Sequence, residues 1–92
     1  AEPELYRDQA PPVEGMVMAT PINGLVEISI GADDGLMKGH KLEVVRLGNG
    51  ENKYLGRIEV VRTEPDRAVC KIVPEYQRGP IQEGDRVVSK IW

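Results

Sequence analysis

Short stretches in which apolar and polar residues alternate account for most of this chain. In residues 25–30, Val26, Ile28 and Ile30 occupy every second position, and Glu27 and Ser29 lie between them. A period of two is typical of a strand with one face in the core and the other toward solvent. Together with the turn residues between the runs, this pattern predicts strands over residues 13–19, 25–30, 41–47, 54–63, 67–73 and 86–91.

The breaks between the predicted strands contain residues that favour tight turns. Asn23-Gly24 is a strong hairpin signal, because both residue types accept positive φ angles. Pro65 stands in the position that a tight turn favours. No helix of ordinary length can be placed in the chain. The sequence therefore predicts an all-β fold, a small and partly open barrel of about six short antiparallel strands.

A glycine motif occurs twice. Leu36 is followed three positions later by Gly39-His40, and Ile81 is followed three positions later by Gly84-Asp85, with a predicted strand after each. We expect each glycine to take a positive φ that turns the chain into the strand, while the apolar residue closes one end of the barrel. The structural bends are predicted at Gly31, Gly35, Gly39 and Gly84.

The character of the chain changes after the first twelve residues. Residues 1–12, AEPELYRDQAPP, are polar, contain prolines and show no alternation, which predicts a linker or extended arm. Residues 13–92 are predicted to form a single barrel domain. Because the chain begins with Ala1 rather than Met, we expect it to be a piece of a longer protein with a missing upstream segment.

Composition narrows the classes of function. The 92 residues include no Phe, one Trp and three Tyr, so the core must be built from Val, Ile, Leu and Met. Twelve Lys and Arg against fifteen Asp and Glu give a net charge of −3, a sign that disfavours nucleic-acid binding. No apolar run is long enough to span a membrane, and no signal peptide is present.

The residue types that usually form catalytic or metal-binding sites are not grouped in this sequence. One Cys and one His supply neither a disulfide nor the ligands of an ordinary zinc site, so no metal or cofactor is predicted. Cys70 lies in an apolar alternation and is expected in the core, and Asp33-Asp34 is expected to form a turn or helix cap. His40 has no nucleophile near it in sequence. We therefore expect no enzyme, and a hydrolase or metal-dependent enzyme is the weakest alternative.

Four valines fall opposite the predicted core faces. These outward positions are Val45, Val61, Val69 and Val88. Either the strands that carry them are covered on both sides, or they form an apolar patch that a protein partner or a second copy covers. Tyr76 and Trp92 could extend such a patch. Edge pairing between copies through residues 67–73 or 86–91 is a further route to self-association.

Basic residues suggest a different function. The set consists of Arg46, Lys53, Tyr54, Arg57 and Arg62, on two neighbouring predicted strands and their connection. Small barrels bind nucleic acids through such faces, with aromatic rings that stack on bases. Acidic residues are interleaved with the basic ones, which favours cross-strand ion pairs. A nucleic-acid or polyanion binder is therefore the alternative to a protein-interaction domain.

The glycine and apolar positions follow a definite order along the chain. They are Val26, Ile28, Ile30, Gly31, Gly35, Leu36, Gly39, Leu42, Val44, Gly56, Ile58, Val60, Ile81, Gly84, Asp85 and Val87. This order resembles the C-terminal SH3-like barrel of the bacterial flagellar assembly protein T family and related envelope domains. The resemblance implies a non-catalytic interaction or scaffolding module at the C-terminal end of a larger bacterial envelope protein. His40 stands where the family pattern has Asp, so a shared partner is not implied.

Overall fold

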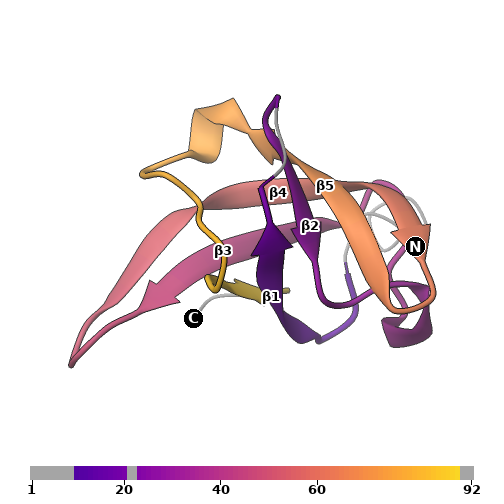
Figure 1. Cartoon of the computed structure of the whole chain (residues 1–92), viewed down its shortest axis with the longest axis horizontal. Helices are drawn as coiled ribbons and strands as arrows, with labels where there is room; N and C mark the ends of the chain where they lie inside the picture. The colour runs from indigo at the N-terminus through magenta and orange to yellow at the C-terminus, as the bar shows by residue number, and fades with distance from the viewer. Residues whose placement is uncertain (1–9, 21–22, 90–92) are drawn as a thin grey trace, which may run out of the picture.

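Six antiparallel strands form a closed barrel in the computed structural model, which describes residues 10–20 and 23–89 (Figure 1). The elements are β1 (Glu14–Ala19), β2 (Leu25–Ile28), β3 (Lys41–Leu47), β4 (Asn52–Glu64), β5 (Arg67–Val73) and β6 (Arg86–Val88), with short 3₁₀ helices η1 (Ala32–Asp34) and η2 (Pro74–Tyr76). Around the barrel the order is β1-β2-β5-β4-β3-β6. The all-β prediction is confirmed.

The barrel is closed rather than partly open, because the short strand β6 pairs with both β1 and β3. Strand β5 likewise has a partner on each side. Neither strand is therefore a free edge, and the predicted edge pairing between copies through residues 67–73 or 86–91 is wrong for the described residues.

Strand limits agree closely with the alternation. Strands β3 and β5 have the predicted limits, whereas β4 is longer than residues 54–63, and β1 begins at Glu14. Strand β2 ends at Ile28, although Ile30 is still buried. Most of the predicted arm, residues 1–9, lies outside the described residues. Ala10, near the end of the arm, and Val13, the first residue of the predicted domain, pack against the core.

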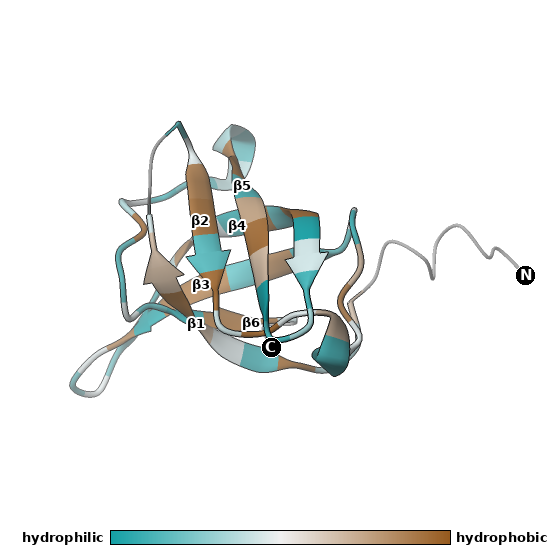
Figure 2. Ribbon diagram, turned by 45° about the vertical axis from the view of Figure 1, so that its right-hand side comes forward, coloured by the Kyte–Doolittle hydropathy of each residue, from teal (hydrophilic) through white to brown (hydrophobic). Residues whose placement is uncertain are grey.

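A cluster of buried apolar side chains forms the core. Its members are Val17, Val26, Ile28, Ile30, Leu36, Leu42, Val44, Leu55, Ile58, Val60, Ala68, Cys70, Ile81 and Val87. Figure 2 shows hydrophobic and hydrophilic segments alternating along the strands that enclose them. Leu36 and Ile81 are both buried, in keeping with their predicted position at the barrel ends.

In the first glycine motif, the loop before β3 forms backbone hydrogen bonds with β4. Gly39 has a φ of 96° and donates its N–H to the Val60 carbonyl at 2.8 Å, and Val60 donates to the His40 carbonyl at 2.8 Å. The buried His40 side chain accepts the Met37 N–H on Nδ1 at 3.0 Å. His40 thus acts as a structural cap of the loop.

The second motif repeats these contacts on β1. Gly84 has a φ of 93° and donates its N–H to the Val17 carbonyl at 2.8 Å, and Val17 donates to the Asp85 carbonyl at 2.8 Å. Asp85 Oδ2 accepts the Gln82 N–H at 2.7 Å. Asp85 therefore occupies the structural position of His40, and both predicted glycine bends have left-handed φ angles.

The other two glycines differ from each other. Gly35 has a φ of 92° and ends η1, as a bend requires. Gly31 has an extended φ of −153°, so the predicted bend at this position has no left-handed backbone. Its lack of a side chain matters for another reason, because a Cβ on Gly31 would lie 2.2 Å from the Glu64 carbonyl oxygen.

The strand order has a two-fold symmetry. Exchanging β1 with β4, β2 with β5 and β3 with β6 converts each pair of neighbouring strands into a pair that is also neighbouring, so the strand order is preserved. Register shifts follow Val17 in β1 and Val60 in β4, and η1 and η2 each lie between the second and third strands of their unit. The barrel thus consists of two β-β-η-β units, and the repeated glycine motif is part of this larger repeat.

Candidate interaction surface

Outward residues of β1, β6, β3 and β4 form two rows across the barrel wall. In one row, Met16 pairs with Arg86, Arg86 with Val45, and Val45 with Tyr54. The other row runs from β1 to β4 as Glu14, Val88, Glu43 and Arg57. These side chains point outward because their buried neighbours, such as Val44 and Val87, point into the core. We call these eight residues the four-strand face.

A chain of polar contacts orders one side of the four-strand face. Glu43 accepts the Tyr54 hydroxyl on Oε1 at 2.7 Å and Arg57 Nε on Oε2 at 2.9 Å. The Arg57 Cζ atom lies 4.0 Å from the centroid of the Tyr76 ring, a cation–π geometry. The four residues therefore hold a guanidinium and a tyrosine ring in fixed positions on the outer surface.

The η2 loop brings Tyr76 to this position. The Arg78 N–H donates to the Leu55 carbonyl at 2.8 Å, which ties the loop to β4. A Cβ on Gly56 would lie 3.1 Å from the Gln77 Cα atom, so the glycine allows the loop to approach the strand closely. Backbone contacts with β4 thus set the location of the ring.

The Tyr54 hydroxyl stays protonated over the ordinary pH range. Burial raises the pKa of Tyr54 to about 12, with further contributions from the hydrogen bond and the charge of Glu43, while the charges of Arg57 and Arg78 oppose the shift. The hydroxyl is therefore a permanent donor to Glu43. Its environment is that of a structural contact rather than of a general base.

The structure separates the predicted partner-binding residues into two groups. Val45 and Val88 are half-buried members of the four-strand face, and Tyr76 lies beside it with 39% of its surface exposed. Val61 and Val69 are also half-buried, but they lie where β4 pairs with β5, and Val61 is roughly 20 Å along β4 from Tyr54. Trp92 lies outside the described residues.

Several exposed apolar residues were not predicted as partner-binding. Met16, 46% exposed, belongs to the four-strand face, and Met18 follows it on β1. Because Val17 points inward, the alternation in β1 already places both methionines outside. Leu47 is exposed on the β3–β4 hairpin, which extends beyond the barrel wall (Figure 1).

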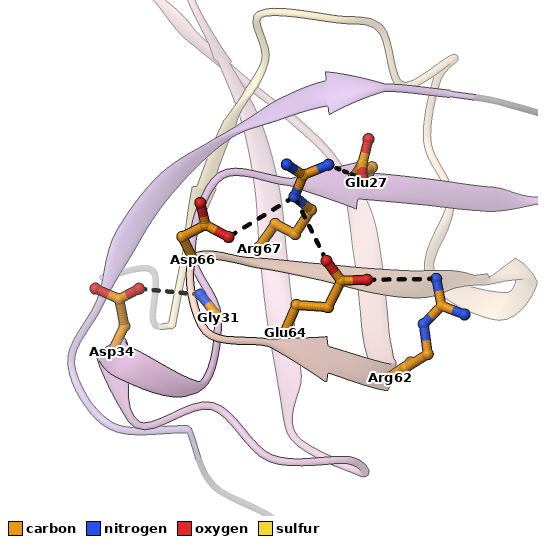
Figure 3. A network of polar contacts seen from close by, with 7 residues as sticks. All are labelled: Glu27, Gly31, Asp34, Arg62, Glu64, Asp66 and Arg67. Atoms are coloured by element: carbon orange, nitrogen blue, oxygen red, sulfur yellow. Dashed lines mark hydrogen bonds and ion pairs between the residues drawn. The ribbon is translucent and has the colours of Figure 1, made fainter.

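Most of the predicted basic set is engaged with carboxylates. Arg46 makes two hydrogen bonds to Asp85, of 2.7 and 3.0 Å, and Arg57 binds Glu43. Arg62 lies 3.8 Å from Glu64 at the far end of β4 (Figure 3). Arg57 and Glu43 form the kind of cross-strand ion pair that the interleaved charges predict, whereas Arg62 and Glu64 both lie on β4 and Asp85 precedes β6.

The acidic pair beside Gly31 has a local structural role. Asp34 Oδ2 accepts the Gly31 N–H at 2.9 Å and caps η1, in agreement with the turn interpretation (Figure 3). The Asp33 N–H donates to the Pro65 carbonyl at 2.8 Å and joins η1 to the β4–β5 turn. Among residues 10–20 and 23–89, no three His, Cys, Asp or Glu side chains are grouped as a metal site.

Cys70 is expected to be unreactive in the folded protein. Its side chain is buried on β5, and burial raises the pKa of the thiol to about 12. Because the thiolate is the reactive form, a disulfide reagent at pH 8 should label Cys70 only when the barrel opens. Labelling should be complete within seconds in denaturant and slower by orders of magnitude without it. Equal rates in the two conditions would contradict the burial.

Within the part of the chain that the structure describes, neither short helix is long and apolar enough to cross a membrane. Comparisons of the chain with protein-family models and with curated protein sequences give no match.

Proposed function

We propose that this barrel is a non-catalytic protein-interaction or scaffolding domain that binds a partner protein through the four-strand face. The observation that carries the proposal is the contact chain from Tyr54 through Glu43 and Arg57 to Tyr76, next to the outward apolar residues Met16, Val45 and Val88. The core does not include any of these side chains. Their order on the outer surface suits contact with another molecule.

The composition of the four-strand face is that of a protein interface. Tyrosine, arginine and methionine are enriched in interfaces, and tyrosine and arginine are frequent among residues that dominate binding energy. Arg57 and Tyr76 are already held by their neighbours, so binding orders fewer side chains and costs less entropy. The resemblance to the C-terminal barrel of the flagellar assembly protein T family supports the same class of function.

The experiment compares two pairs of outward valines. Val45→Lys with Val88→Lys should abolish partner binding, because two charges would replace apolar contacts on the four-strand face. Val61→Lys with Val69→Lys is the matched control, since these valines are equally half-buried but lie outside that face. Crosslinking pull-downs from extracts of the source cells measure retention, after thermal melts show that both double variants fold.

The three possible outcomes have different meanings. A partner retained by the wild type and by the control, but lost with the first double variant, supports the four-strand face. Loss of the partner only with the Val61 and Val69 variant would show that the interface lies on β4 and β5 instead. Retention of the same proteins by all three forms would contradict an interface at either group.

A nucleic-acid or polyanion binder has less support from the contacts. Arg46 and Arg57 already pair with carboxylates, and Arg62 lies at the opposite end of β4 from Lys53 and Tyr54. A row of unpaired cations along one face is the usual basis of such binding.

A further inference from the structure

We propose that the partner segment bound by the four-strand face is acidic, and that a carboxylate side chain of this segment binds Arg57 and Arg78 beside Tyr76. This inference rests on the proposed function and names the chemistry of the partner. Three features of the structure carry it: which half of each ion pair is exposed, the orientation of Arg57, and the location of Arg78.

Two ion pairs, Glu43–Arg57 and Asp85–Arg46, bury the carboxylate more deeply than the cation. The Glu43 side chain is 13% exposed and its partner Arg57 is 29% exposed. In the second pair, the Asp85 side chain is 4% exposed and its partner Arg46 is 34% exposed. At these two pairs an approaching molecule therefore meets guanidinium groups, whereas in the Arg86–Glu14 pair the carboxylate is the more exposed partner.

Arg57 is oriented for a further contact. Its Nε atom donates to Glu43, and its Cζ atom lies over the Tyr76 ring, 4.0 Å from the ring centroid. Within residues 10–20 and 23–89, its two terminal nitrogens have no hydrogen-bond partner. A guanidinium held in this way presents paired N–H groups in a geometry that matches a carboxylate.

Arg78 supplies a second cation at the same place. Its side chain contacts only the backbone carbonyls of Glu75 and Gln77, each at 3.4 Å, and no carboxylate among the described residues. These two carbonyls belong to the residues before and after Tyr76, and the Arg78 N–H donates to the carbonyl of Leu55, the residue after Tyr54. Arg57 and Arg78 are thus both held beside Tyr76.

Isolated carboxylates fit this arrangement better than a nucleic-acid backbone does. Arg86, the other arginine of the four-strand face, is paired with Glu14. Glu75 lies on η2 next to Tyr76, and the whole chain has a net charge of −3. A phosphate chain that extended from the Arg57 position would meet these acidic groups, whereas an acidic side chain on a peptide needs only the local pair of cations.

The test uses an end-blocked hexaglutamate peptide as probe, titrated at low salt into the ¹⁵N-labelled domain. Amide signals of residues 54–57 and 76–78 should shift. Arg78→Gln should weaken peptide binding about tenfold, as expected for loss of a charge-assisted hydrogen bond. Arg57→Gln should weaken it at least as much. Arg62→Gln, an exposed arginine at the other end of β4, is the matched control and should leave binding unchanged.

Four results would overturn the inference: no shifts, equal shifts with a hexaglutamine peptide, the same loss from Arg62→Gln, or tighter binding of an octathymidylate strand to the same residues. The last would assign the cations to nucleic acid. Because Arg78 has no carboxylate partner in the described fold, its variant should stay folded and keep the test decisive. If Arg78→Gln keeps the partner that the Val45 and Val88 variant loses, the interaction function stands and acidic recognition fails.

Discussion

Replacement of Gly31 by alanine is expected to lower the free energy of unfolding by about 3 kcal/mol or more, a large part of the total for a domain of this size. An added Cβ would lie 2.2 Å from the Glu64 carbonyl oxygen and 2.4 Å from the Arg67 carbonyl oxygen. Both are backbone atoms of the β4–β5 turn, so no rotamer change relieves the overlap. The turn would have to move away from η1 and lose the hydrogen bond from Asp33 to Pro65. Urea unfolding measures the loss.

Gly50→Asn is the matched control for this substitution. Gly50 has a φ of 84°, but an added Cβ there meets nothing within 4 Å. Asparagine tolerates left-handed backbone better than other residues with a side chain, so the change should cost less than about 1 kcal/mol. If Gly31→Ala unfolded at the same urea concentration as the wild type, the close approach of the two turns would be refuted.

Asp85→Ala is expected to cost about 2–4 kcal/mol of stability. The buried carboxylate caps the Gln82 N–H and accepts two hydrogen bonds from Arg46, so the alanine variant leaves the Gln82 N–H and Arg46 Nε without a partner. Arg46 is one-third exposed and can be hydrated in the variant, which keeps the loss below that of a fully buried ion pair. Chemical denaturation at pH 7 measures the difference.

Asp85→Asn separates the cap from the charge. The amide oxygen can still accept the Gln82 N–H, so this variant should be more stable than Asp85→Ala. Burial opposes ionisation of Asp85, but hydrogen bonds from Arg46 and Gln82 and the Arg46 charge outweigh it, and the pKa lies below the usual value. The charge therefore stabilises the fold above about pH 4, and this contribution is lost as the pH falls through the lowered pKa. The stability gap between wild type and Asp85→Asn should narrow from pH 7 to pH 2, and a constant gap would contradict the assignment.

Local pattern predicts most of this fold because each strand has one face in a single core. The alternation of Val26 and Ile28 is imposed by the barrel interior, and Asn23 and Gly24 take the positive φ angles that their residue types favour. The repeated motif is also visible in the sequence, because Gly39 and Gly84 each need a left-handed backbone.

Closure of the barrel could not be predicted in this way. It depends on the pairing of β6 with β1 and β3, and both strands are far away from β6 in the sequence. Gly31 was expected at a bend, but its requirement comes from the backbone of β4 and β5, which no local pattern reveals.

The candidate surface could be predicted only in part. Alternation identifies Val45 and Val88 as outward, but the register shift after Val60 and the strand pairing decide that Val61 and Val69 lie elsewhere. Tyr76 contacts Arg57 from a loop whose sequence shows no hydrophobic alternation. The position of this loop is fixed by its contacts with β4. The contact chain around Glu43 therefore needed the three-dimensional structure.

Emergence of this chain from a ribosome would leave its first β-β-η-β unit without most of its partners. Only β1 and β2 pair within that unit, whereas β3 pairs with β4 and β6, and β2 also pairs with β5. The core stays open until Arg86–Val88 has been made, so we expect late, cooperative folding with no stable half. Because the units complete one another, the first unit of one molecule fits the second unit of another, and crowded nascent chains are expected to form domain-swapped dimers.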